Sequence, residues 1–170
     1  STATSQTVTG LTNGTAYTFK VAATTAAGTG ADSAASSPVT ARTVPGAPTA
    51  VTGTPGNTTV SLAWTAPASN GGSAITGYTV TPFIGANAQT PVAFASTATS
   101  QTITGLTNGT SYTFKVKATN AAGTGLDSAA SGAITPRTVP GAPTGATATP
   151  EALALLTREY RKGYEVPQQV

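Results

Sequence analysis

Carboxylates are the side chains in this sequence with the clearest capacity for chemistry, because they act as general acids and bases and bind metal ions. Before residue 150 the sequence holds two of them, Asp32 and Asp127. Hydrolysis of a glycosidic bond by paired carboxylates requires the two groups to lie within ~10 Å of each other. Asp32 and Asp127 occupy equivalent positions in two copies of an internal repeat, so the repeat separates them. We interpret each as a solvated loop residue.

The sequence contains no histidine and no cysteine. Their absence removes the usual general base, the thiolate nucleophile, the preferred zinc ligands and any disulfide bond. Gly28-Thr29-Gly30 and Gly123-Thr124-Gly125 are similar to fragments of phosphate-binding loops. Neither opens a helix with a following lysine, so flexible connections are expected instead. We predict no catalytic, cofactor-binding or metal-binding residue, no cofactor and no enzymatic activity in this chain.

Two further groups of residues could carry a binding or modification site. Asn13, Asn57 and Asn108 each open an Asn-x-Thr glycosylation pattern, but such matches are common in a threonine-rich sequence, and two of these lie in a predicted turn. Phe83 and Phe94 could stack on sugars, but two phenylalanines without aromatic neighbours make a poor platform. We interpret the asparagines as turn residues and the phenylalanines as core or edge packing.

The composition limits the partners. Charged residues make up 8% of the sequence and the net charge is +3, whereas soluble domains typically have about 25% charged residues. Solubility must rest on Ser, Thr, Asn and Gly, which suits an extracellular or cell-surface protein. The basic residues cluster only in the acid-containing stretch 158–162, so we predict no nucleic-acid binding. No apolar run approaches the ~20 residues of a membrane span.

An internal repeat sets the domain organisation. Residues Ser1 to Thr7 recur as Ser96 to Thr102, an offset of 95 residues, and the match continues without a gap through the Val-Pro-Gly-Ala-Pro element at 44–48 and 139–143. We predict the C-terminal half of one domain at 1–43, a complete domain at 44–138, and the start of a diverging third repeat at 139–170. The prolines of the Val-Pro-Gly-Ala-Pro element predict stiff, extended junctions between the domains. Residues 1–43 should expose one face of their sheet.

Alternating apolar residues and turn signals predict an all-β sandwich for residues 44–138. The clearest pattern runs from Gly105 to Ala118, where a tight turn precedes a strand with Tyr112, Phe114, Val116 and Ala118 on one face. The other expected strands are 49–54, 59–64, 75–82, a short edge strand within 84–91, 92–94, 101–104 and 133–137. We expect loops at 67–73 and 120–131.

One set of residues in this domain resembles the fibronectin type III family in its bacterial or phage form. The set comprises Pro48, Trp64, Tyr78 and the pattern Leu106-x-x-Gly109-x-x-Tyr112. The resemblance implies an immunoglobulin-like β-sandwich in tandem copies, with Trp64 as the core anchor and Tyr112 as a tyrosine corner. Its buried hydroxyl must bond to nearby backbone, and we expect a carbonyl of the turn as its partner.

The resemblance also implies a function. Such modules are non-catalytic extracellular spacers or interaction modules that position a neighbouring catalytic or binding domain. The alternatives are an accessory region of a secreted polysaccharide-degrading glycoside hydrolase, of a surface adhesin or of a phage structural protein. The expected partners are the neighbouring domains, with polysaccharide or a cell-surface protein as further candidates. The integrin-binding tripeptide that some relatives carry is absent from residues 122–127.

The final twenty residues depart from the repeat. Position 159, where Trp64 should recur, is Glu159. Thr149 and Pro150 can begin a helix and Gly163 can end it, so we predict a short helical tail. Two interpretations remain: a docking tail for a partner or neighbouring domain, or an abrupt end of the third repeat through truncation or a change of reading frame.

Overall fold

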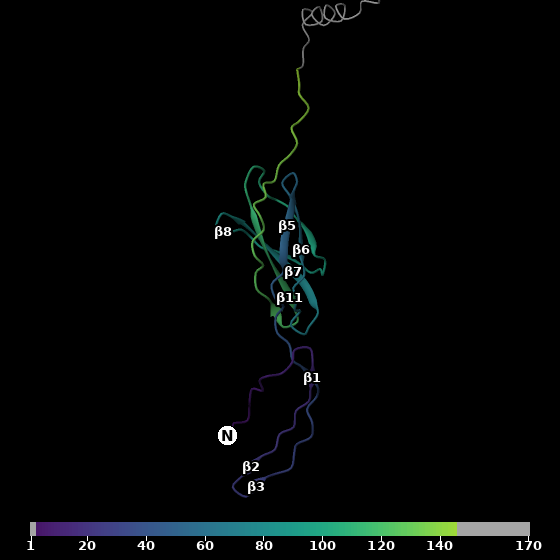
Figure 1. Cartoon of the computed structure of the whole chain (residues 1–170), viewed down its shortest axis with the longest axis vertical. Helices are drawn as coiled ribbons and strands as arrows, with labels where there is room; N and C mark the ends of the chain where they lie inside the picture. Colours follow the sequence, from purple (N-terminus) through teal and green to yellow (C-terminus); the bar gives the residue numbers. More distant parts are fainter. Residues whose placement is uncertain (1–2, 146–170) are drawn as a thin grey trace, which may run out of the picture. The chain divides into compact units, whose positions relative to one another are not determined.

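The computed structural model describes residues 3–145 (Figure 1). The predicted helix at 149–163 lies outside the described residues. Contacts group the described residues up to Thr138 into one compact unit, which ends before Val139. All regular structure in residues 3–145 is β-strand, which confirms the predicted all-β class.

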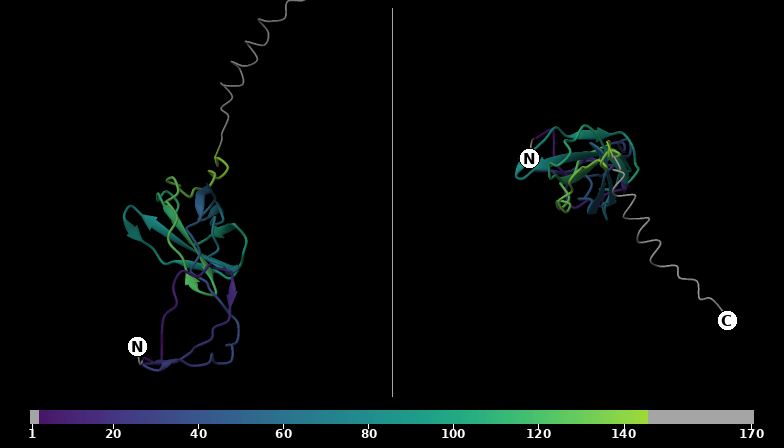
Figure 2. Two further views of the ribbon diagram at one scale, coloured as in Figure 1. Left: turned by 60° about the horizontal axis from the view of Figure 1, so that its bottom comes forward. Right: turned by 90° about the horizontal axis from the view of Figure 1, so that it is seen from above.

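Residues 44–138 form two antiparallel sheets (Figures 1 and 2). The first sheet has the order β10-β6-β5, and the second has the order β12-β11-β7-β8, with β9 paired to β7. The strands of the first sheet are β5 (Thr49–Pro55), β6 (Val60–Thr65) and β10 (Ser100–Ile103). Those of the second are β7 (Ile75–Ile84), β8 (Asn87–Ala88), β9 (Val92–Phe94), β11 (Thr113–Asn120) and β12 (Gly123–Thr124).

The core lies between these sheets because each contributes one apolar face. Burial alternates strictly along β6 and β11, so that Val60, Leu62 and Trp64 are buried from one sheet. Phe114 and Val116 are fully buried from the other, as the alternation predicts. The Trp64 and Tyr78 rings meet edge to face, with centroids 5.1 Å apart, a geometry that aromatic pairs favour.

Three predicted elements differ from the structure. β7 continues two residues past Pro82, because Phe83 and Ile84 pair with β8 across a short turn. The stretch 120–131 is not a simple loop: β11 includes Asn120, and β12 pairs back onto its end. The predicted closing strand at 133–137 is reduced to a single bridge between Ile134 and Tyr112.

Residues 3–43 contain four two-residue strands. β1 (Ala16–Tyr17) pairs with β4 (Val39–Thr40), and β2 (Thr24–Thr25) pairs with β3 (Gly28–Thr29). Val21 is 73% exposed here, whereas its repeat counterpart Val116 is 0% exposed. The apolar face of this repeat is therefore uncovered, as the sequence predicts.

Candidate functional site

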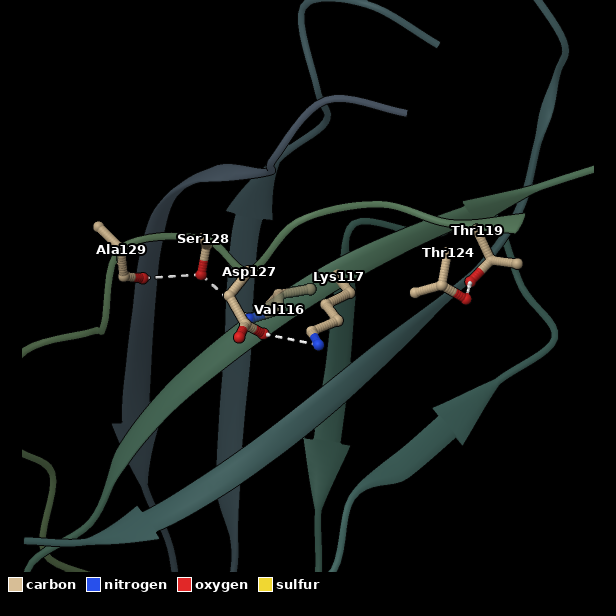
Figure 3. A network of polar contacts seen from close by, with 7 residues as sticks. All are labelled: Val116, Lys117, Thr119, Thr124, Asp127, Ser128 and Ala129. Atoms are coloured by element: carbon tan, nitrogen blue, oxygen red, sulfur yellow. Dashed lines mark hydrogen bonds and ion pairs between the residues drawn. The ribbon is translucent and has the colours of Figure 1, made fainter. Parts of the chain in front are cut away.

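The two candidate carboxylates each lie beside a lysine of their own repeat. Figure 3 shows Asp127, whose Oδ1 lies 3.7 Å from Nζ of Lys117. In the preceding repeat Oδ2 of Asp32 lies 4.0 Å from Nζ of Lys20. All four side chains are more than a third exposed, so these pairs are surface ion pairs of small energy. Within residues 3–145 each aspartate is therefore paired with a lysine and not with a second carboxylate. In residues 3–145 no group of three or more acidic side chains could hold a metal ion.

The two glycine-rich candidates are strands rather than phosphate loops. Gly28–Thr29 forms β3 and Gly123–Thr124 forms β12, each in a tight hairpin with the preceding strand. The expectation of flexible connections is therefore wrong. The hairpin of β11 and β12 is reinforced by a hydrogen bond of 2.9 Å between the hydroxyls of Thr119 and Thr124, also drawn in Figure 3.

The side-chain amide of Asn108 is engaged in the turn rather than free. Its Oδ1 accepts the Thr58 N–H at 2.8 Å, and its Nδ2 donates to Oδ1 of Asn57 at 2.7 Å. These bonds join the turn before β11 to the turn between β5 and β6. For Asn57 and Asn108 these bonds agree with the structural role that the sequence predicts.

The two unassigned phenylalanines lie on different strands, Phe83 on β7 and Phe94 on β9. Phe94 pairs with Tyr78 and packs against the core. Phe83 pairs with Thr113, and Nζ of Lys115 lies 5.2 Å from its ring centroid, a cation–π contact. Neither ring joins the other in a platform on which a sugar could stack.

A hollow of about 710 Å³ lies over the uncovered face of the first repeat and is lined by Val8, Leu11, Phe19 and Val21 among others. Their counterparts Ile103, Leu106, Phe114 and Val116 are at most 8% exposed in the complete domain. In residues 44–138 the equivalent surface is covered and forms part of the β-sandwich core. The hollow is not a built ligand pocket.

The tyrosine corner is present in both repeats. The hydroxyl of Tyr112 accepts the Thr107 N–H at 3.2 Å, and the hydroxyl of Tyr17 accepts the Thr12 N–H at 3.0 Å. The expected partner, a carbonyl of the turn, is therefore wrong: the turn presents an amide hydrogen to the phenol oxygen. This bond favours the phenolate and lowers the pKa of Tyr17 below its usual value.

These features decide the family. Residues 46–133 match the model of the fibronectin type III domain, which spans the sandwich, its buried Trp64 and the Tyr112 corner. The chain belongs to the fibronectin type III family. One domain is matched, so the tandem arrangement remains an inference from the repeat.

Parts of three bacterial enzymes are similar to this chain. It is 44% identical to Chitinase A1 of Niallia circulans over 81% of its own length and 41% identical to Endoglucanase B of Cellulomonas fimi over 79%. A third match, at 46% identity over 74% of this chain, is Exoglucanase A of Cellulomonas fimi. The chain spans only 19% of the chitinase and 13% of each glucanase.

Solved structures agree on the fold. A titin fragment superimposes with a TM-score of 0.50 at 33% identity, covering 54% of this chain and 32% of the titin chain. The kinase region of twitchin from C. elegans gives a TM-score of 0.50 at 28% identity, covering 55% of this chain and 17% of twitchin's. Among residues 3–145 no helix is long and apolar enough to cross a membrane.

Sequence reasoning missed two structural roles. Ser128 and Ser131 bind the edge of β11 through their side chains, and Asn120 binds the segment that joins the two repeats. The Ser-x-x-Ser spacing, present in both repeats, was a usable signal for the serines. The partner of Asn120 lies 77 residues away, so no local pattern could have indicated it.

Proposed function

We propose that this chain is a non-catalytic spacer within an exported enzyme that degrades polysaccharide. Its fibronectin type III repeats hold a neighbouring catalytic or binding domain at a distance, outside the cell or at its surface. The domains are residues 1–43, the C-terminal half of one repeat, residues 44–138, a complete repeat, and residues 139–170, the start of a third. The proposed partners are the neighbouring domains, and we assign no ligand site to residues 3–145.

The observation that carries this proposal is the match to three polysaccharide-degrading enzymes, each of which is much longer than the matched part. The geometry supports the non-catalytic role, because the two acids of the described repeats each lie beside a surface lysine. These relatives favour an enzyme over a surface adhesin or a phage structural protein as the parent.

The test has two arms. The isolated chain is incubated with insoluble chitin and cellulose, and we expect neither release of soluble sugar nor depletion of the chain from the supernatant. In the parent enzyme, replacing residues 44–138 by a Gly/Ser linker should lower activity on the insoluble polymer and leave activity on a soluble oligosaccharide unchanged. Hydrolysis by the isolated chain, or equal loss on both substrates, would contradict the spacer role.

A further inference from the structure

The segment that joins the two repeats, residues 43–46, is bonded to the complete domain at two points. The Thr43 N–H donates to the Gly71 carbonyl at 2.8 Å, and the Gly46 N–H donates to the Ser69 carbonyl at 2.9 Å. Both acceptors belong to the loop Ser69-Asn70-Gly71-Gly72, called here the 69–72 loop. Pro45, between the two donors, is fully buried. These contacts fix the joining segment on the surface of the domain that follows it.

Asn120 at the end of β11 ties the same two parts together. Its Nδ2 donates to the Thr43 carbonyl at 2.9 Å and to the Asn70 carbonyl at 2.7 Å, while its Oδ1 accepts the Ala122 N–H at 2.8 Å. The side chain is buried, with Asn120 4% exposed. Both amide hydrogens are thus used to hold the joining segment against the 69–72 loop, in surroundings where losing either bond is costly.

Glycines allow the backbones to approach this closely. A Cβ on Gly71 would overlap the Thr43 carbonyl, and a Cβ on Gly125 would overlap the Pro45 carbonyl. Gly71 also has a φ of +70°, which side chains rarely adopt. A side chain at position 71 or 125 would therefore occupy the space that the joining segment fills.

The next contact reaches the preceding repeat itself. A Cβ on Gly72 would overlap the Gly14 nitrogen and would lie 2.7 Å from the carbonyl carbon of Asn13. Gly14 is in turn fixed to its own repeat, because its N–H donates to the Ala41 carbonyl at 2.8 Å. The turn of one repeat therefore rests directly on the 69–72 loop of the next.

We propose that these contacts make a fixed joint, which holds the two repeats in one orientation instead of letting them swing about residues 43–46. The inference deepens the proposed spacer role and rests on it for its biological meaning. Repeats joined by flexible links can fold back on one another, which shortens the distance between the two ends of the spacer. A fixed joint keeps the two ends apart. The 69–72 loop, Asn120 and the Asn13-Gly14 turn are the parts of the joint.

A distance measurement between spin labels tests the joint in the full chain. The sequence has no cysteine, so a pair of introduced cysteines labels cleanly. Ala35→Cys in the first repeat and Thr54→Cys on β5 are both exposed. We expect a single narrow distance distribution. A broad distribution in the otherwise unchanged chain would overturn the proposal.

Gly72→Ala is the decisive variant, with Gly105→Ala as its control. The two glycines have similar φ values, +79° and +74°, so alanine is strained at both, but nothing lies within 4 Å of a Cβ on Gly105. We expect the narrow distribution to be lost in Gly72→Ala and kept in Gly105→Ala. A narrow distribution that survives Gly72→Ala would contradict the joint.

Asn120→Asp is a second variant in case Gly72→Ala does not fold. It keeps the shape of the side chain but removes both donors and places a carboxylate against two carbonyls. Fluorescence of Trp64, the single tryptophan, reports whether the complete domain remains folded. With that emission unchanged, we expect a broadened distribution, and an unbroadened one would contradict the joint. The distances do not depend on activity, so failure of the joint and failure of the spacer role are distinguishable.

Discussion

The two tyrosine corners place one residue type in one local geometry but in two environments. Tyr112 is 5% exposed and lies in the core of a complete sandwich, whereas Tyr17 is half-buried on an uncovered sheet. Each hydroxyl accepts the N–H of the residue five positions earlier, Thr107 or Thr12. The difference between the two sites is therefore solvent access, which sets the cost of losing the hydroxyl.

Tyr112→Phe should lower the free energy of unfolding by about 1–3 kcal/mol, because it leaves the Thr107 N–H without its acceptor next to a buried ring. Denaturant titration followed by Trp64 fluorescence measures this loss. Tyr17→Phe is the matched control and should leave the midpoint unchanged, since water can reach the Thr12 N–H. A midpoint for Tyr112→Phe equal to that of the unaltered chain would show that the corner does not stabilise the domain.

Single residues could be predicted where their role depends on nearby sequence. Trp64, Tyr78 and Tyr112 were indicated by spacing, and all three are at most 5% exposed. The prediction that a carbonyl binds the Tyr112 hydroxyl is wrong, since the Thr107 N–H binds it. The sequence does not show which backbone group faces the phenol, because that depends on the turn at Gly105, whose φ is +74°. Asn120 could not be assigned, because both of its carbonyl partners come from distant parts of the chain.

At the level of elements, the last segment of the domain pairs with β11 through serine side chains. Oγ of Ser128 accepts the Val116 N–H at 3.0 Å, while the Ser128 N–H donates to the Val116 carbonyl at 2.9 Å. Ser131 repeats both bonds with Phe114. Serines three apart thus pair with strand residues two apart, so the segment follows β11 without being a regular strand.

Ser128→Ala should destabilise the domain by about 1–3 kcal/mol, because the hydroxyl is the acceptor for the Val116 N–H and the residue is 4% exposed. Ser33→Ala removes the equivalent bond to the Val21 N–H, which lies in the exposed repeat, and serves as the control. Urea titrations of the two variants provide the comparison. Equal, negligible effects would mean that the backbone bonds alone hold this segment.

Regular elements were predictable to the extent that apolar residues alternate. β6 and β11 alternate throughout, and the structure has them close to the predicted bounds. Residues 120–137 are mostly Gly, Ala, Ser and Thr, which carry no such alternation. Their backbone bonds are set by β11 and by serine hydroxyls, so the sequence predicted a loop and a strand where the structure has a hairpin and an irregular edge.

At the level of the whole molecule, the repeat organises the chain, and its polar surface carries few charges. Asp32 and Asp127 occupy equivalent positions, but their lysine partners do not, because Lys20 corresponds to Lys115 and not to Lys117. Both ion pairs, Lys20–Asp32 and Lys117–Asp127, are exposed to solvent. Exposed pairs of this kind contribute little and are screened by salt. Stability in this molecule therefore rests on the apolar core and on hydrogen bonds, which change little with ionic strength or near-neutral pH.

The unfolding midpoint of the complete domain should accordingly be almost constant from about pH 5 to about pH 8, because the sequence has no histidine to titrate in that range. Tyr17 lies in the preceding repeat, and its lowered pKa affects the stability of that repeat only under alkaline conditions. Its phenolate accepts the Thr12 N–H more strongly, so this contribution is present above the unfolded value of about 10 and is lost as pH falls through the lowered folded pKa.

Asp127→Asn should cost less than about 1 kcal/mol at any salt concentration. Urea titrations followed by Trp64 fluorescence measure the first prediction across this pH range and the second at low and high NaCl. A large salt-dependent shift of the unaltered chain, absent in Asp127→Asn, would show that the Lys117–Asp127 pair stabilises the domain far more than its exposure allows.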